Sequence, residues 1–369
     1  MDLVGNRVVV LGGGVGGVAA AVRLAGKFEV TLVSKSDFVY YADIPKLFFE
    51  GLDASKAVWP LGRLESAGIK LMRGSVTNID AANRVVRLAE GERAIEYDQL
   101  VVALGANVDA KPHLWSTEGL NLFMEEFTKS ANRRVVVCVE GTPYRCPPAP
   151  FDVAHRLASH LERLGRKPES VTVIHPEKHP LAGIGLHVYE AVMESMSRVG
   201  VNVIGGFQLR EVNWDRGVLT SESGEKVSFD LLHLIPKHTP PQPISQSELA
   251  APNGWGSANR DLRSTKYDDV HLIGDTVAPT LGLPMAGFLA LYGADSVASK
   301  LTGSQPRLTP EASCPVEAST NSIIPLCDFN PKLQGKPLPE CTVARVDQRF
   351  MRFFRDLTRT KFLNEIGLS

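Results

Sequence analysis

The sequence predicts an α/β fold in which one doubly wound parallel-sheet domain is inserted into another, followed by a small C-terminal domain with an amphipathic helix. Three observations predict it. Apolar strand-like and helix-like stretches alternate from the first residues onward, the alternation starts again near residue 134, and a basic amphipathic stretch lies near the C-terminus. The expected domains are residues 1–106 with 264–310, residues 107–263, and residues 311–369.

Composition narrows the class of protein. The chain has 369 residues, of which 44% are hydrophobic, enough for more than one core. The 40 Lys and Arg balance the 41 Asp and Glu, so there is no basic excess of the kind that drives nucleic-acid binding. No apolar run reaches the length of a membrane span, and the N-terminus leads directly into a strand rather than a signal peptide. We expect a protein that is cytoplasmic or peripheral to a membrane and does not bind nucleic acid.

A glycine-rich turn connects the first predicted strand, residues 7–11, to the first predicted helix. Gly12, Gly14 and Gly17 have the GxGxxG spacing of dinucleotide-binding βαβ units. The first glycine permits a tight turn, the second lets the backbone approach a pyrophosphate, and the third lets the helix pack on the sheet. The helix N-terminus attracts the phosphates. The turn therefore predicts a Rossmann-like dinucleotide site, with a plain glycine turn as the alternative.

The second predicted strand ends without the acidic residue that usually bonds a ribose hydroxyl. Ser34 and Lys35 occupy that position. A serine hydroxyl accepts such a bond only weakly, while the lysine favours a phosphate. The ribose contact is therefore expected to depart from the usual pattern.

Two later segments indicate which dinucleotide is bound. Residues 97–105 form an apolar strand that ends in a small-residue turn, and residues 270–275 form another that ends in Gly-Asp. In this order they resemble the second and third flavin motifs of the two-dinucleotide-binding flavoproteins. The resemblance implies FAD, with Asp275 bonding the ribityl chain and the helix that starts near residues 284–287 directed at the flavin ring; two buried strands with ordinary turns are the alternative. The residues predicted to bind FAD are Gly12, Gly14, Gly16, Gly17, Ser34, Lys35, Tyr41, Ala103, Gly105, Gly274, Asp275, Ala286 and Gly287.

The inserted domain has its own strand and helix alternation but lacks a second glycine fingerprint. Its first strand, residues 134–138, runs into the proline-rich stretch 139–150. Proline removes amide donors that would cradle a pyrophosphate. The next strand ends at His175 rather than at an acidic residue. Both features predict a degenerate NAD(P)H site.

The five cysteines are too few for a disulfide scaffold, and none lies in a CxxC pair. Cys138 lies inside an apolar strand, where packing is its expected role. His175, His179 and His187 lack the spacing of a metal cluster and are predicted to lie on the surface. No metal site is expected.

The stretch 144–152 resembles the segment that carries one redox cysteine in sulfide:quinone oxidoreductases and in the flavoprotein subunit of flavocytochrome c sulfide dehydrogenase. In those families a second cysteine lies far along the chain, in a strand of the C-terminal domain, and Cys327 has that position. The resemblance covers nearly the whole chain from Gly12 onward. It implies a redox disulfide between Cys146 and Cys327, with Asp152, six residues after Cys146, as a general base.

Three positions depart from those families. Asp43 stands where flavocytochrome flavoproteins have the cysteine that tethers FAD, so covalent attachment is not expected. Residues 107–133 hold no third cysteine. Met285 replaces the lysine that those families commonly place beside the flavin. An unusual flavin potential follows, because a positive charge there favours the anionic reduced ring.

The chemistry of a cysteine pair beside a flavin also supports sulfide oxidation. Hydrosulfide attack on a disulfide leaves a persulfide on one cysteine and a thiolate on the other. We assign the persulfide to Cys146 and the flavin-facing thiolate to Cys327, with two inert buried cysteines as the alternative. Cys314 and Cys341 are lesser candidates for an accessory role.

The C-terminal stretch is basic and amphipathic. Its apolar face comprises Val346, Phe350, Phe353, Phe354 and Leu357, and arginines flank it. Such a helix can lie in a membrane interface, where the enzyme would draw quinone from the bilayer. The alternative is a helix packed on the protein's own core or on a second copy in a homodimer.

The leading hypothesis is FAD-dependent oxidation of sulfide or another small sulfur species to sulfur or polysulfide, with quinone as the electron acceptor. The alternatives are a flavocytochrome-type sulfide dehydrogenase, an NAD(P)H-dependent persulfide or disulfide reductase, and a non-catalytic flavin-binding subunit. The degenerate second nucleotide site disfavours the reductase, as it disfavours a type II NADH dehydrogenase.

Overall fold

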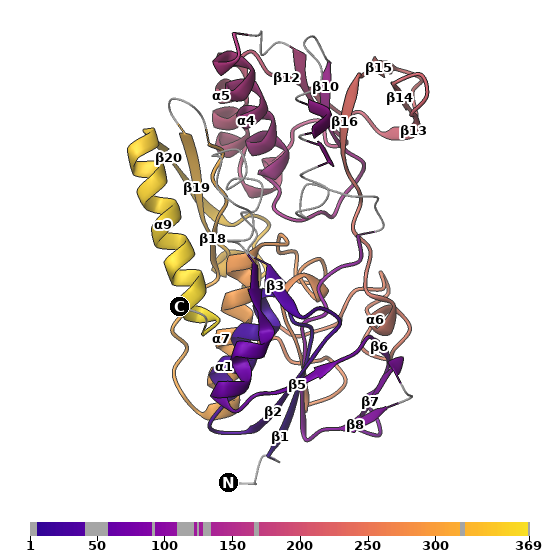
Figure 1. The fold of residues 1–369 in the computed structure, drawn as a ribbon, viewed down its shortest axis with the longest axis vertical. Helices are drawn as coiled ribbons and strands as arrows, with labels where there is room; N and C mark the ends of the chain where they lie inside the picture. The colour runs from indigo at the N-terminus through magenta and orange to yellow at the C-terminus, as the bar shows by residue number, and fades with distance from the viewer. Residues whose placement is uncertain are drawn as a thin grey trace.

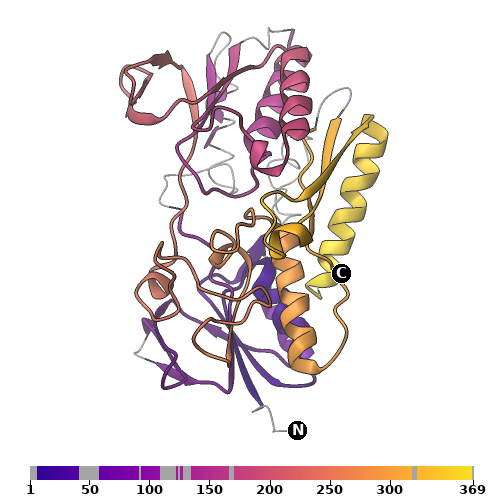
Figure 2. The ribbon, with the colours of Figure 1, turned by 180° about the vertical axis from the view of Figure 1, so that it is seen from behind.

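The computed structural model describes residues 6–40, 58–90, 93–108, 122–123, 125–127, 134–165, 170–317 and 322–367. Two α/β domains lie one above the other in Figure 1, and a C-terminal sheet with a long helix runs along one side of both. The view from behind in Figure 2 shows the same arrangement, with the C-terminal sheet and helix along one side of both domains. The predicted α/β class with two Rossmann-like domains is confirmed.

The first domain is built on a five-stranded sheet with the strand order β17-β9-β1-β2-β5. All four pairings between these strands are parallel. The apolar run of β1 is buried on both faces of the sheet, as parallel strands between two layers require. The strands are β1 (Arg7–Leu11), β2 (Glu29–Ser34), β5 (Lys70–Arg73), β9 (Gln99–Val102) and β17 (Val270–Leu272).

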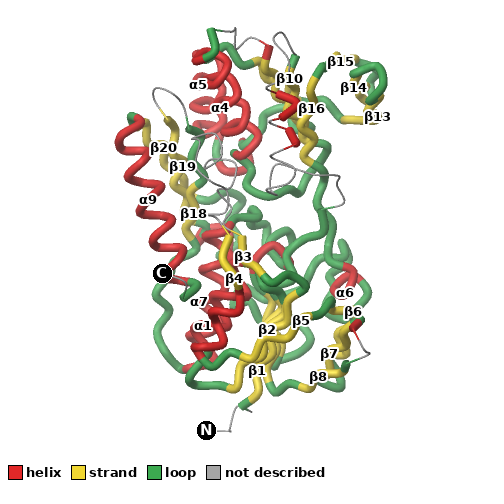
Figure 3. Tube along the Cα trace, in the orientation of Figure 1, coloured by secondary structure: helices red, strands yellow, loops and turns green. Residues whose placement is uncertain are grey.

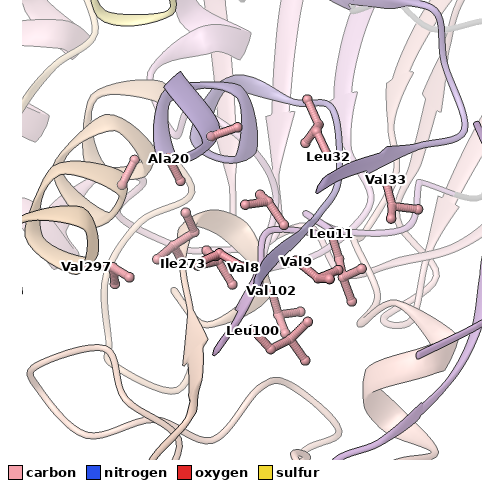
Figure 4. Close-up of a cluster of buried hydrophobic side chains, with 14 of the residues drawn as sticks. Val8, Val9, Leu11, Ala20, Leu32, Val33, Leu100, Val102, Ile273 and Val297 are labelled. Carbon is pink, nitrogen blue, oxygen red and sulfur yellow. The ribbon is translucent and has the colours of Figure 1, made fainter. Parts of the chain in front are cut away.

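Two helices, α1 (Val15–Leu24) and α7 (Gly287–Thr302), pack together against this sheet. Figure 4 shows Ala20 of α1, Val297 of α7 and Ile273 gathered over the strand residues Val8 and Val9. Small residues let the two helices approach closely. Shorter elements complete the domain: β3 (Phe38–Tyr40), β4 (Val58–Pro60), the 3-10 helix at Leu61–Ala67, β6 (Val76–Asp80), β7 (Val85–Leu88) and β8 (Ala94–Glu96).

The inserted domain has a four-stranded parallel sheet with the order β12-β11-β10-β16. Helices α4 (Ala149–Arg163) and α5 (Leu186–Arg198) pack against it. An antiparallel meander follows the sheet. The strands are β10 (Val135–Val139), β11 (Val171–His175), β12 (Asn202–Gly205), β16 (Leu231–Ile235), and in the meander β13 (Leu209–Asn213), β14 (Val218–Ser221) and β15 (Lys226–Ser228).

The chain passes between the two domains twice, at Asn107 and Thr239, which pair as an antiparallel bridge. Beyond this crossing the chain returns to the first domain, where Ile244, in the short helix α6 (Gln242–Ser245), and Leu262 join the first core. The expected domain boundary near residue 263 therefore lies too far along the chain. The prediction followed strand alternation, which does not show to which core a loop returns.

The C-terminal part contains an antiparallel sheet with the order β18-β19-β20 and the helix α9 (Gln348–Glu365). Figure 3 shows α9 in red alongside β19 and β20 in yellow. Asp347 caps the helix by accepting a hydrogen bond from the backbone of Phe350. Val346 therefore ends strand β20, and the prediction that it belongs to the helix is wrong. The strands are β18 (Glu311–Ser313), β19 (Ser322–Asp328) and β20 (Glu340–Val346), with the short helix α8 (Asn330–Leu333) after β19.

Three residues of the predicted apolar face of α9 are exposed, and a fourth, Phe354, is half-buried. Phe350, Phe353 and Leu357 are 48%, 61% and 55% exposed, whereas Met351 and Phe362 are buried against the chain. The helix nevertheless packs on the protein's own core, as the alternative expected, but through Met351 and Phe362 rather than through this face. Among the described helices, none is long and apolar enough to cross a bilayer.

Candidate active site

The glycine turn has the shape that a dinucleotide requires. A Cβ added to Gly12, whose φ is +110°, would lie 2.2 Å from the carbonyl oxygen of Ala103, and one added to Gly17 would lie 1.9 Å from the carbonyl oxygen of Gly12. These two glycines permit close packing. A Cβ on Gly14 would meet nothing within 4 Å, and no side chain caps the helix that starts there. The first amides of α1 thus border open space at a helix N-terminus, where a pyrophosphate fits.

The other predicted residues of this turn have different surroundings. A Cβ at Gly16 would lie 3.3 Å from the carbonyl oxygen of Ala290, so glycine at this position allows α1 to pack closely on α7. Ser34 borders the turn at the end of β2, and its hydroxyl donates to the carbonyl of Ser36 at 2.7 Å. Lys35 is exposed. Tyr41 lies outside the described residues.

The second and third flavin motifs meet at the carboxyl edge of the sheet. The amide of Gly105 donates to the hydroxyl of Thr276 at 2.8 Å, and that hydroxyl donates to the carbonyl of Gly105 at 3.2 Å. Gly105 and Gly274 have φ values of +71° and +66°, which favour glycine. Sequence reasoning missed Thr276, which directly follows the Gly-Asp pair.

The loop that follows β10 in the inserted domain, which carries Arg145 and Cys146, contacts these motifs. Arg145 Nε lies 2.6 Å from Oδ2 of Asp275, and a Cβ on Gly105 would lie 3.3 Å from Arg145 Nη2. The amide of Cys146 donates to the carbonyl of Met285 at 2.8 Å. The loop thereby places a guanidinium beside Asp275 and a sulfur beside the start of α7. The sequence offered no signal for the Arg145–Asp275 pair, since the two residues lie in different domains.

The buried side chain of His175 contacts the same loop at Tyr144, away from Asp275. The amide of Glu177 donates to Nδ1 of His175, so the ring proton is on Nε2, which donates to the hydroxyl of Tyr144 at 3.0 Å. That hydroxyl donates to the carbonyl of Pro147 at 2.8 Å. Burial lowers the pKa of His175 to about 4, which keeps the ring neutral.

The prediction that His175 lies on the surface is therefore wrong, because the proline-rich loop folds over it. His179 and His187 are exposed as predicted. The edge of the second sheet, where a nucleotide would bind in a reductase, is occupied by the loop that carries Cys146.

The structure pairs the cysteines differently from the expectation. Cys146 forms a disulfide with Cys314, and Cys327 forms one with Cys341. The expected Cys146–Cys327 disulfide is therefore wrong for this structure, because Cys327 and Cys341 stand directly opposite each other in the register of β19 and β20. This left Cys314, just after β18, as the partner of Cys146.

Both disulfides border the start of α7. Cys327 is buried among apolar side chains that include Leu289, with Leu283 and Ala286 partly buried beside it. Cys146 bonds to the backbone of Met285 in the same stretch. Cys138 is a buried free thiol whose pKa burial raises to about 12, which agrees with its predicted packing role.

Asp152 is part of a buried ion network. Its Oδ2 accepts a hydrogen bond from Arg156 Nε at 3.0 Å, and its Oδ1 accepts one from the backbone amide of Glu317 at 2.7 Å. Arg156 Nη2 reaches the carboxylate of Glu317 at 2.6 Å, and Arg355 of α9 lies 3.4 Å from the same carboxylate. Both oxygens of Asp152 are engaged. These contacts argue against the expected role as a general base and indicate that Asp152 positions the segments that follow Cys146 and Cys314.

Comparison with known proteins agrees with this geometry. Residues 6–136 match the family model described as pyridine nucleotide-disulphide oxidoreductase. The mitochondrial sulfide:quinone oxidoreductase of Mus musculus is 24% identical over 74% of this chain and 66% of the relative, and that of Dictyostelium discoideum is 26% identical over 73% and 65%. The chain thus matches slightly less than two thirds of either relative.

A solved structure matches more of the chain. The sulfide:quinone oxidoreductase from Aquifex aeolicus superposes with a TM-score of 0.81 at 20% identity, covering 98% of this chain and 92% of the other. At this identity the likeness establishes the fold.

The fold and the glycine-lined site are those of an oxidoreductase that takes FAD as its cofactor, and residues 6–136 are similar to the pyridine nucleotide-disulphide oxidoreductases. Over more of its length the chain is similar to the sulfide:quinone oxidoreductases.

Proposed function

We propose that the chain is an FAD-dependent oxidoreductase that oxidises sulfide to sulfur or polysulfide through the Cys146–Cys314 disulfide. The observation that carries the proposal is the contact between the segment that bears this disulfide and the flavin motifs. Cys146 bonds to the backbone of Met285, and the neighbouring Arg145 pairs with Asp275. The similarity to sulfide:quinone oxidoreductases supports the same substrate.

The residues around the disulfide suit attack by a small anion. Cys146 and Cys314 are both half-buried, so hydrosulfide has access while bulk solvent is limited. Arg145, the residue before Cys146, carries a positive charge that pairs with Asp275, and α4 begins three residues after Cys146 with its N-terminal dipole. Attack at Cys146 forms a persulfide there and releases the Cys314 thiolate. FAD, when bound, accepts the electron pair.

Arg145 also bears on the missing lysine at position 285. The backbones of Arg145 and Met285 pair as a parallel bridge, and the Arg145 guanidinium lies beside Gly105 and Asp275. We propose that this guanidinium provides the positive charge that Met285 lacks.

The electron acceptor proposed here is quinone, reached at a membrane surface. The exposed face of α9 carries Phe350, Phe353 and Leu357, and the helix is fixed to the first domain by buried Phe362 and by the ion pair of Glu365 with Arg23. A fixed helix with an exposed aromatic face and flanking arginines suits a membrane interface.

The test is an anaerobic titration of the purified yellow protein with sulfide, and separately with NADH, while the flavin absorbance is followed. Cys146→Ser removes the proposed point of attack, and Cys138→Ser is the matched control because that thiol is buried elsewhere. We expect sulfide to bleach the parent and Cys138→Ser but not Cys146→Ser. Rapid bleaching by NADH in all three proteins, with none by sulfide, would move the chain to the NAD(P)H-dependent reductases.

A further inference from the structure

We infer that the second disulfide, Cys327–Cys341, is a redox partner of the first, and that Cys314 connects them by thiol–disulfide exchange. This step deepens the function proposed above and rests on it for the arrival of hydrosulfide. It assigns reaction roles to Cys314 and Cys341, which complete a chain of four cysteines.

Strand register brings Cys314 next to Cys327. Ala312 of β18 lies directly opposite Cys327 of β19, and Cys314 follows two residues later, on the same face if the extended chain continues. Such diagonal neighbours have Cα atoms about 7–8 Å apart, just beyond the roughly 4.4–6.8 Å that a disulfide spans. Cys314 lies just past the end of β18, so a small movement closes the gap.

The surroundings also favour exchange over inert packing. Cys327 is 5% exposed, which shields its sulfur from external thiols, whereas Cys314 and Cys341 are half-buried. A thiolate released at Cys314 therefore has Cys327 as an internal target. The imidazole of His187 lies 2.9 Å from the carbonyl oxygen of Cys341 and holds the backbone at the last of the four cysteines.

The exchange balances as follows. Hydrosulfide forms a bond to Cys146 Sγ, the Cys146–Cys314 bond breaks, and Cys314 leaves as a thiolate. That thiolate forms a bond to Cys327 Sγ, the Cys327–Cys341 bond breaks, and Cys341 leaves as a thiolate. The second step is redox-neutral, since one disulfide replaces another, and it moves the reducing equivalents from Cys314 to Cys341.

A trapping experiment on the full-length holoprotein tests the step without relying on turnover. The double variant Cys146→Ser/Cys341→Ser leaves Cys314 and Cys327 without their present partners. We expect them to join, giving a linked peptide by mass spectrometry after non-reducing digestion. The matched control, Cys146→Ser/Cys327→Ser, leaves Cys314 and Cys341 on opposite sides of β19, about 10 Å apart, and no link is expected.

Free Cys314 and Cys327 thiols in the first variant, or equal linking in both, would overturn the exchange. Should the variants fold poorly, the parent protein gives the same readout. Substoichiometric dithiothreitol followed by rapid alkylation traps the Cys314–Cys327 peptide if exchange occurs, and yields only the two original linkages if it does not. Sulfide bleaching without a trapped link would refute only this step, whereas a trapped link without sulfide bleaching would refute only the proposed substrate.

Discussion

The backbone amide of Glu317 donates to the carboxylate of Asp152 at 2.7 Å, so the segments that follow Cys314 and Cys146 are joined a second time beside their disulfide. Arg156 strengthens this contact by pairing with both carboxylates. The polar contact does not depend on the redox state of the sulfurs. It is therefore expected to hold the two cysteines close while the disulfide is open.

Asp152→Ala is expected to destabilise the protein by about 1–3 kcal/mol, because the buried guanidinium of Arg156 loses one hydrogen-bond acceptor while it keeps its ion pair with Glu317. Urea unfolding measures this loss, and Asp215→Ala on the exposed turn after β13 is the control. Asp152→Asn should leave the pH profile of flavin bleaching unchanged. A stable Asn variant that loses one limb of that profile would restore the general-base role.

Stability is expected to fall as the pH falls from about 6.5 to about 4. Burial lowers the pKa of His155, His175 and His271 to about 4, so the unfolded chain binds protons at these rings before the folded chain does. The contribution of these neutral rings to the free energy of unfolding is fully present above pH 6.5, and it is lost as the pH falls through their folded pKa of about 4. With three protons involved, the slope approaches roughly 4 kcal/mol per pH unit.

Chemical denaturation at stepped pH values measures this slope. His155→Gln should lower it by roughly 1.4 kcal/mol per pH unit, the value for one proton. The exposed His179→Gln should not change it. Equal slopes in the parent and both variants would show that His155 is not held neutral.

Alanine substitutions separate packing from cofactor binding in the glycine turn. Gly17→Ala should fail to fold normally, because its Cβ would lie 1.9 Å from a backbone oxygen. Gly14→Ala should keep the thermal stability of the apoprotein. It should lower the ratio of bound FAD to protein at least tenfold, a loss of about 1.4 kcal/mol in binding free energy, because the methyl group enters the open space beside the helix start. Gly62→Ala, also in open space, is the control. Full flavin occupancy in Gly14→Ala would move the pyrophosphate site elsewhere.

Phe353→Asp is expected to reduce binding of the protein to vesicles that contain anionic lipid, since it removes an aromatic ring that is 61% exposed. Cosedimentation at low ionic strength measures the bound fraction, which should fall several-fold. Trp214→Asp changes a ring that is 54% exposed in the inserted domain and should leave binding intact. If the two variants lose binding equally, the contact is not specific to α9.

Local patterns in the sequence predicted most of the fold and the cofactor turn. The glycine spacing and the apolar runs act over a few residues, so the β1-α1-β2 unit and the motifs at Gly105 and Gly274 follow from them directly. The C-terminal helix was also predicted, because helical periodicity is local.

The cysteine pairing depends on contacts that no local pattern contains. Cys327 faces Cys341 because of the register between β19 and β20, and a shift of one residue would have separated them. His175 is buried because a distant loop covers it, although its own neighbours in sequence include exposed polar residues. The Arg145–Asp275 pair likewise requires the two domains to be in place.

The disulfide between Cys146 and Cys314 closes a loop of 168 residues. By chain entropy, closing a loop of this length lowers the free energy of the folded state relative to the unfolded one by roughly 5 kcal/mol. If hydrosulfide opens this bond in each reaction cycle, the protein loses that constraint for the lifetime of the open state. The substrate would then govern not only the oxidation of the sulfurs but also the rate at which the whole chain is exposed to proteases and aggregation.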